Sequence, residues 1–330
     1  MVVPALSRPA RPDERVILLS DTVWDAHGDA IRRIVPDVRP VVYVGDEPVP
    51  DEILEDVEVA FLSSDVWPDR IRGISISVLK APNLRWMQTF SAGVDSPFFA
   101  QLRGKGVRLT TASGATASPI AQTVVLYMLA LSRDMRSWMR KQDAREWKQH
   151  PIDELDGSRL AVVGMGPIGE EIARLGVALG MDVIGVRRTP TGHEPCPTVT
   201  FDELPNVLRR SDWVAVALPL TPGTLGMFGD AEFAAMRPGA RFINVGRGEL
   251  VDEPALVRAL HTGHLAGAGL DVFATEPLPV DSPLWAMDNV IITPHNSGTS
   301  QRSLGRVVEI FLDNLERYLN GRDLRNEVSG

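Results

Sequence analysis

Short apolar runs alternate with amphipathic stretches along the first third of the chain. Five runs rich in Val, Ile and Leu have the length and composition of buried strands; they cover residues 16–19, 41–44, 57–62, 84–89 and 107–110. Between them, residues 24–35 and 69–79 carry apolar side chains at helical spacing and polar side chains on the outer face. Such alternation predicts a parallel sheet covered by helices, so we expect the first domain to be α/β.

A second series of the same kind begins near Ser118 and Pro119, which have the N-cap and first-turn preferences of a helix start. The helix predicted there carries Ile120, Val124 and Met128 on one apolar face. Six further strand candidates follow, at residues 160–164, 183–186, 213–217, 242–245, 269–272 and 290–293. Six parallel strands with intervening helices are the number in a complete dinucleotide-binding fold.

The last apolar pattern is a helical stripe that starts near Ser300 and includes Leu304, Val308, Phe311 and Leu315. A lone amphipathic helix must bury its stripe, and we expect this one to pack on the first domain. The predicted fold is therefore two Rossmann-like, doubly wound parallel-sheet α/β domains with a cleft between them. The substrate domain is expected to be flavodoxin-like and discontinuous, with residues 1–112 plus 302–330, around an NAD(P)-binding Rossmann domain of residues 113–301.

The composition narrows the choice of ligand and compartment. The net charge of −9 opposes binding to nucleic acid or to an anionic membrane, so we expect a small-molecule ligand. The first fifteen residues lack the apolar core of a secretion signal, and the apolar helix at 119–131 is shorter than the roughly 20 residues that cross a bilayer. Cys196 is the only cysteine, and no cluster of metal ligands is evident. We expect a cytoplasmic protein without a metal.

A glycine-rich turn, Gly-Met-Gly-Pro-Ile-Gly at residues 164–169, stands between a predicted strand and a predicted helix. In a dinucleotide-binding turn the first glycine permits the tight turn, the second lets the backbone approach the pyrophosphate, and the third lets helix and strand pack closely. An ordinary glycine-rich turn can have the same letters, but this position favours a cofactor site whose phosphates face the helix N-terminus. The residues assigned to it are Gly164, Gly166, Pro167, Ile168 and Gly169.

The end of the next predicted strand carries Arg187, Arg188 and Thr189, where an NAD-specific fold has an acidic residue that binds the ribose 2′-hydroxyl. Guanidinium groups bind a 2′-phosphate through charge-assisted hydrogen bonds, whereas a carboxylate would repel it. We therefore predict that NADP(H) is preferred and that NAD(H) remains possible. The alternative is that one or both arginines extend into solvent without a ligand.

Three later segments each follow a predicted strand: residues 243–248 with Arg247, 270–277 with Glu276, and 293–298 with His295. The carboxyl ends of parallel strands lie at one edge of the sheet, so these side chains can converge despite their separation in sequence.

With these segments on view, the chain resembles the D-isomer-specific 2-hydroxyacid dehydrogenase family, and within it the glyoxylate and hydroxypyruvate reductase branch. The likeness extends over nearly the whole chain. It includes the Ser-Ala-Gly-Val-Asp loop at 91–95, the glycine turn, the Leu-Pro-Leu-Thr segment at 218–221 and the three later segments, all in the family's order.

The resemblance implies a role for each candidate residue. Arg247 would bind the 2-oxo group and carboxylate of the substrate, and backbone amides of Ala92 and Gly93 would hold the carboxylate from the first domain. His295 would also contact the substrate, as general acid for ketone reduction, and Glu276 would hydrogen-bond the other imidazole nitrogen. Asp271 would face the nicotinamide carboxamide. The remaining residues assigned to the cofactor are Leu218, Pro219, Thr224, Val245, Gly246, His295 and Gly298.

The resemblance also implies a homodimer, because residues 137–151 fall where the family has a dimerisation arm that would let Trp138 or Trp147 reach the neighbouring subunit. A solvated helix end is the competing interpretation. The expected function is NAD(P)H-dependent reduction of a small 2-oxo acid, glyoxylate-like or hydroxypyruvate-like, to the D-2-hydroxy acid. The alternatives are a nucleotide-sensing protein similar to the corepressors of this family, and a related dehydrogenase for another substrate such as formate or phosphonate.

Overall fold

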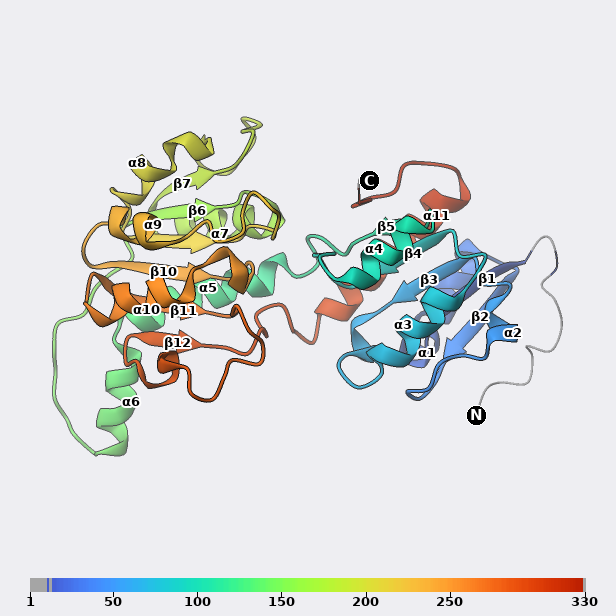
Figure 1. The fold of residues 1–330 in the computed structure, drawn as a ribbon, viewed down its shortest axis with the longest axis horizontal. Helices are drawn as coiled ribbons and strands as arrows, with labels where there is room; N and C mark the ends of the chain where they lie inside the picture. The colour runs from blue at the N-terminus through green and yellow to red at the C-terminus, as the bar shows by residue number, and fades with distance from the viewer. Residues whose placement is uncertain (1–10, 12–13, 329–330) are drawn as a thin grey trace. The chain divides into compact units, whose positions relative to one another are not determined.

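The chain forms two compact units in the computed structural model, which describes residue 11 and residues 14–328 (Figure 1). The first unit contains the chain up to Ala115 and again from Ser300 onward, and the second runs from Thr116 to Thr299. The first unit is therefore discontinuous in sequence. None of the helices in the described part of the chain is long and apolar enough to cross a membrane.

The first unit is built on a five-stranded parallel sheet in the order β2-β1-β3-β4-β5. The strands are β1 (Arg15–Ser20), β2 (Val38–Tyr43), β3 (Val59–Leu62), β4 (Trp86–Thr89) and β5 (Arg108–Thr110). All five strands predicted here are confirmed, and their order is that of flavodoxin-like folds. Alternate residues of β1 enter different cores, Leu18 on one face and Ile17 on the other, so the sheet is buried on both sides.

Helices cover both faces of this sheet: α1 (Asp21–Ile34), α2 (Asp51–Leu54), α3 (Ile71–Lys80), α4 (Pro97–Gly104) and α11 (Ser303–Leu319), with the 3₁₀ turn η2 (Ser64–Val66). The expectation that the last helix packs on the first domain is confirmed, because Phe311 of α11 stacks on Phe61 of β3 with ring centroids 4.3 Å apart. Two helices of this unit, α2 and α4, were not predicted. α2 is too short to show the spacing of apolar residues that is typical of a helix. The start of α4 could have been recognised from its N-cap residue, Ser96, whose side chain accepts a hydrogen bond from the amide of Phe98.

The second unit contains a seven-stranded parallel sheet in the order β12-β11-β10-β9-β6-β7-β8. The strands are β6 (Arg159–Val163), β7 (Asp182–Val186), β8 (Thr198–Val199), β9 (Trp213–Val216), β10 (Ala240–Asn244), β11 (Leu265–Leu270) and β12 (Val290–Ile292). All six predicted strands occur, but the bounds predicted for β11, residues 269–272, were wrong, because this strand begins at Leu265 and ends at Leu270. β8 was missed because it is two residues long and follows a proline-rich segment, yet it extends the sheet by pairing Val199 with Val186.

The helices of this unit are α5 (Ala117–Ser132), α6 (Met135–Asp143), α7 (Pro167–Ala178), α8 (Leu204–Leu208), α9 (Asp230–Ala235) and α10 (Glu253–His261), with 3₁₀ turns η3 (Phe201–Glu203), η4 (Gly248–Leu250) and η5 (Pro283–Ala286). The predicted start of α5 was wrong, because Thr116 and not Ser118 is the N-cap. Pro119 fits inside the first turn, where backbone amides have no intrahelical acceptor, and the Ser118 hydroxyl instead accepts from Gln122.

Candidate active site

The glycine turn between β6 and α7 has the geometry expected of a dinucleotide-binding turn. Gly164 has a φ of +104°, and a Cβ there would lie 2.6 Å from the carbonyl oxygen of Ala217. A Cβ at Gly169 would lie 1.8 Å from the carbonyl oxygen of Gly164, so this glycine allows α7 to pack on the strand. A Cβ at Gly166 would meet nothing within 4 Å. Two glycines are therefore required by the fold, whereas Gly166 borders open space.

That open space belongs to a hollow of about 500 Å³ at the carboxyl ends of β6, β7 and β9. These ends lie level because Val163 is in register with both Val186 and Val216. Eight of the predicted cofactor residues line the hollow: Gly164, Gly166, Arg187, Arg188, Thr189, Leu218, Pro219 and Thr224. Sequence reasoning missed the other lining residues, Met165, Phe201, Ala217 and Thr221.

Other predicted cofactor residues lie outside the lining of this hollow. Pro167, Ile168 and Gly169 form the first turn of α7, directly after Gly166, which lines the hollow. Further along the chain, the remaining members of the predicted set belong to the loops that follow β10, β11 and β12: Val245, Gly246, Asp271, His295 and Gly298.

The two arginines after β7 differ in their surroundings. The Arg187 side chain is 27% exposed, and its Nη1 donates to Glu194 Oε1 at 2.8 Å and lies 3.7 Å from Glu170 Oε1. Arg188 is exposed. The end of the strand carries no acid, but a carboxylate from the following loop reaches one of its arginines.

Glu276 and His295 form a close pair in the second unit. The imidazole Nδ1 of His295 lies 2.8 Å from Glu276 Oε2, while Glu276 Oε1 accepts from the amide of Phe273 at 3.0 Å. With Nδ1 facing a carboxylate, the proton available for exchange resides on Nε2. His295 is half exposed and has a φ of +49°.

The loop that carries His295 is held by Asp271, which is fully buried at the end of β11. The amide of His295 donates to the backbone carbonyl of Asp271 at 2.8 Å. The carboxylate accepts from the Thr293 hydroxyl at 2.5 Å, from the amide of Asn296 at 2.9 Å, and from the amide and hydroxyl of Ser297. The implied contact of Asp271 with a nicotinamide stays a prediction; its visible contacts organise residues 293–297.

This network extends to α5 through a contact that sequence reasoning missed. The hydroxyl of Tyr127 hydrogen-bonds that of Thr293, and burial raises the pKa of Tyr127, which keeps the phenol neutral. A Cβ on Gly269 would lie 2.6 Å from the Tyr127 ring, so this glycine makes room for the tyrosine over β11. The signal available was Gly269 itself, an isolated glycine inside an apolar strand.

Arg247 lies in the turn after β10, at the start of η4. Asn244 fixes this turn, because its side chain donates to the carbonyl of Arg247 at 2.9 Å and accepts from the amide of Gly246 at 3.0 Å. A Cβ at Gly248 would lie 1.8 Å from the carbonyl carbon of Phe273. Gly248 thus allows the Arg247 segment to lie against the backbone next to Glu276, which brings two of the three predicted segments together.

The predicted substrate contacts Ala92 and Gly93 belong to the first unit, in the loop after β4. Ser91 shapes this loop: its hydroxyl accepts from the amide of Gly93 at 3.1 Å and donates to the carbonyl of the same residue at 2.5 Å. Ala92 is exposed.

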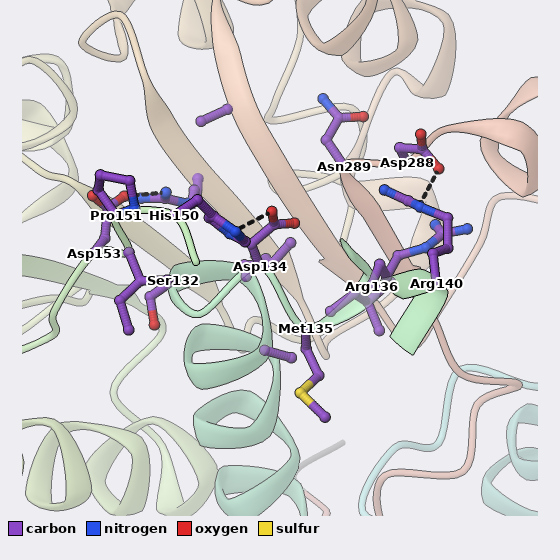
Figure 2. Close-up of a pocket in the computed structure, with 16 residues that line it drawn as sticks. Ser132, Asp134, Met135, Arg136, Arg140, His150, Pro151, Asp153, Asp288 and Asn289 are labelled. Carbon is purple, nitrogen blue, oxygen red and sulfur yellow. Dashed lines mark hydrogen bonds and ion pairs between the residues drawn. The ribbon is translucent and has the colours of Figure 1, made fainter. Parts of the chain in front are cut away.

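A second hollow, of about 330 Å³, lies between α6, residues 150–153 and the start of β12 (Figure 2). Its charged groups pair with one another, as Figure 2 shows: Arg140 contacts Asp288 at 2.8 Å, and His150 contacts Asp134 at 3.1 Å. Arg136 donates to the backbone carbonyls of residues 287 and 290, both at 2.7 Å. These contacts attach α6 to the edge of its own sheet.

The two tryptophans of the predicted arm have different environments. Trp138 stacks on His150 of the same chain with ring centroids 4.2 Å apart, whereas Trp147 is 97% exposed. Trp138 is partly buried, so Trp147 is the more exposed of the two. Within the described residues, no group of three or more His, Cys, Asp or Glu side chains is arranged to hold a metal ion.

Comparison with known proteins identifies the family. The model of the NAD binding domain of the D-isomer specific 2-hydroxyacid dehydrogenases matches residues 125–297, which lie inside the second unit and include Arg247, Glu276 and His295. The chain belongs to this family. It is accordingly an oxidoreductase that acts on CH–OH groups.

Individual relatives match most of the chain. It is 33% identical over 303 residues to glyoxylate/hydroxypyruvate reductase B of Citrobacter koseri, covering 89% of this chain and 90% of the relative. A D-isomer specific 2-hydroxyacid dehydrogenase from Xanthobacter autotrophicus Py2, solved in complex with NADPH and MES, has a TM-score of 0.76, 32% identity and coverage of 96% and 98%. An NADPH-dependent glyoxylate/hydroxypyruvate reductase from Sinorhizobium meliloti, solved with NADP and sulfate, has a TM-score of 0.76, 26% identity and the same coverage.

Proposed function

We propose that this dehydrogenase reduces a small 2-oxo acid of the glyoxylate or hydroxypyruvate type to the D-2-hydroxy acid with NADPH. The observation that carries the proposal is the Glu276–His295 pair, because it leaves a half-exposed imidazole Nε2 able to exchange a proton at the edge of a dinucleotide-binding sheet. The names of the relatives from Citrobacter koseri and Sinorhizobium meliloti support the choice of substrate class.

The residues present fit a dinucleotide. The open space beside Gly166 lets a pyrophosphate approach the backbone, and the N-terminus of α7 supplies amide donors and a partial positive charge. Arg187, Arg188 and Thr189 at the end of β7 would surround the adenosine ribose and its 2′-phosphate. When bound, NADPH supplies the hydride.

The chain's own residues would supply the proton and the electrostatic stabilisation. As hydride adds to the carbonyl carbon of the substrate, the electron pair of the C=O bond moves to its oxygen, which takes the proton from Nε2 of His295. The carboxylate of Glu276 would stabilise the imidazolium before this transfer and fix the orientation of the ring. Arg247 would bind the substrate carboxylate and the alkoxide charge that develops on the oxygen.

The test of this function is an assay of NADPH oxidation by the purified protein with glyoxylate, hydroxypyruvate, pyruvate, phenylpyruvate and longer 2-oxo acids. We expect turnover with the first two, and a higher kcat/KM with NADPH than with NADH, because the arginines after β7 favour the 2′-phosphate. Absence of turnover on every acid would favour a nucleotide sensor. A higher kcat/KM with NADH would reject the cofactor preference.

We also propose that the protein is a homodimer whose arm includes α6 and Trp147. Exposed large apolar side chains recur in this part of the chain, from α5 to the end of the arm: Leu126, Leu129, Met135, Met139, Trp147 and Ile152. Light scattering should therefore give the mass of two chains. Trp147→Ser should raise the dimer dissociation constant about 30-fold, since a buried interface tryptophan commonly contributes about 2 kcal/mol or more.

Val280→Ser is the matched control for the dimer test, because Val280 is equally exposed in the same unit but lies far along the chain from the arm. We expect it to leave the dissociation constant unchanged. A monomer at working concentration in the unmodified protein would reject the arm.

A further inference from the structure

The loop that connects β7 to β8 is organised by a single carboxylate. Glu194 Oε1 accepts from the amide and the hydroxyl of Thr191 at 2.7 and 2.9 Å, and Glu194 Oε2 accepts from the amide of Gly192 at 2.9 Å. Its side chain is only 3% exposed. Hydrogen bonds from the Thr191 backbone above all, together with Arg187, lower the pKa of Glu194 to about 2, so it is ionised throughout the range of ordinary assays.

The same carboxylate holds Arg187. Glu194 Oε1 lies 2.8 Å from Nη1 of the guanidinium, and the amide of Arg187 donates to the carbonyl of Val199 in β8 at 3.0 Å. Both the backbone and the head group of the arginine are therefore anchored before any ligand binds. The acidic contacts involve Nη1 alone, so the edge formed by Nε and Nη2 is not used in them. Arg187 also lines the hollow beside the glycine turn.

We propose that Glu194 is a specificity-determining residue that acts through Arg187: it positions the guanidinium for the 2′-phosphate of NADPH without contacting the nucleotide. This role rests on the proposed preference for NADPH. A long arginine side chain that is fixed in advance loses less conformational freedom when the phosphate binds, and preorganisation of this kind increases affinity. Arg188 is exposed and is not held by Glu194, so the two arginines contribute differently: Arg187 as a fixed fork and Arg188 as a mobile charge.

Glu194→Gln separates this role from a simple effect of charge. An amide cannot replace the carboxylate, because whichever way it turns, its NH₂ group faces either the Gly192 amide or the donors gathered at Oε1. Glu170→Gln is the matched control. The carboxylate of Glu170 lies 3.7 Å from the same Nη1, but its side chain is 47% exposed on α7. Glu170→Gln therefore removes an equal charge near the same guanidinium without disturbing the loop.

The experiment measures the dissociation constants of NADPH and NADH by nicotinamide fluorescence in the full-length protein. We expect Glu194→Gln to raise the Kd of NADPH about tenfold or more, as for loss of a hydrogen bond to a charged group. The Kd of NADH should change less than about twofold, because NADH lacks the 2′-phosphate. Glu170→Gln should change neither. Glu194→Asp, which keeps the charge and shortens the reach, should weaken NADPH in the same direction and provides the measurement if the glutamine variant does not fold.

A double-mutant cycle tests whether Glu194 acts through Arg187. In an Arg187→Ala background, adding Glu194→Gln should change the Kd of NADPH by less than about twofold, since the residue being positioned is gone. A further large loss of NADPH affinity in that background would show that Glu194 supports the whole loop and does not act through Arg187, and it would overturn the proposal. Equal weakening of NADH and NADPH, or tighter NADPH binding in Glu194→Gln, would overturn it as well.

The measured dissociation constants distinguish an error in the proposed NADPH preference from an error in the proposed role of Glu194. If the unmodified protein binds NADH as tightly as NADPH, the preference is wrong and the role of Glu194 falls with it. If the unmodified protein prefers NADPH and Glu194→Gln keeps the same ratio of dissociation constants, only the role of Glu194 is wrong.

Discussion

His295→Ala is expected to lower kcat for the reduction of glyoxylate or hydroxypyruvate by roughly 10²- to 10⁴-fold, the usual range for loss of a general acid. The dissociation constant of NADPH should change much less than kcat, because His295 lies outside the lining of the nucleotide hollow. Single-turnover measurements with saturating NADPH would separate the chemical step from binding.

Two further variants make the histidine test specific. Glu276→Gln keeps the size of the partner but removes the charge opposite Nδ1, so we expect a smaller loss in kcat than for His295→Ala. His261→Ala changes an exposed histidine in the last turn of α10 and should have the activity of the unmodified protein. An unchanged kcat in His295→Ala would remove His295 from the mechanism.

Gly166→Ala and Gly169→Ala are expected to affect different properties: the first weakens NADPH binding, and the second lowers the free energy of unfolding. Gly166→Ala should change the free energy of unfolding by less than about 1 kcal/mol, because its Cβ meets no atom within 4 Å and only the N-cap preference is altered. It should greatly weaken NADPH, because the methyl group fills the space through which the pyrophosphate approaches the backbone. Gly169→Ala should destabilise the fold itself by about 1–3 kcal/mol or more, because its Cβ would lie 1.8 Å from the carbonyl oxygen of Gly164.

Urea unfolding of each variant without cofactor, followed by titration with NADPH, distinguishes the two glycines. Gly305→Ala on α11 is a useful control, because its Cβ also meets nothing within 4 Å and it lies in the first unit. If Gly166→Ala binds NADPH normally, the open space beside Gly166 is not where the pyrophosphate lies.

The sheets could be predicted from the sequence because parallel strands are buried on both faces and appear as continuous apolar runs. Boundaries were less well defined: α5 begins at Ala117, since the proline that seemed to mark its first position is tolerated anywhere in the first turn. β8 was invisible because a two-residue strand has no period. It forms only because Gly185 and Val186 of β7 offer it a free edge.

Site residues that belong to a local sequence motif could be predicted. Site residues that are defined by a contact between distant segments could not. The glycine turn and the residues after β7 carry local signals, and five of their predicted residues line one hollow: Gly164, Gly166, Arg187, Arg188 and Thr189. By contrast, the hydrogen bond between Tyr127 and Thr293 joins residues far apart in the chain, and neither segment carries a sequence pattern that predicts contact with the other. Glu194 was likewise hidden, because its position in a proline-rich loop resembles that of a solvated acid until the loop is folded around it.

The discontinuity of the first unit has a consequence for biosynthesis. Phe311 of α11 stacks on Phe61 and lies in the same core as Trp86, yet the ribosome makes it only after every residue from Thr116 to Thr299. The second unit can therefore fold as soon as it emerges, while one face of the first unit's sheet is covered by α1 alone until α11 is made. Apolar surface that stays exposed in this way promotes aggregation and binds chaperones. We therefore expect the nascent chain to be prone to aggregation in the interval between translation of β5 and translation of α11.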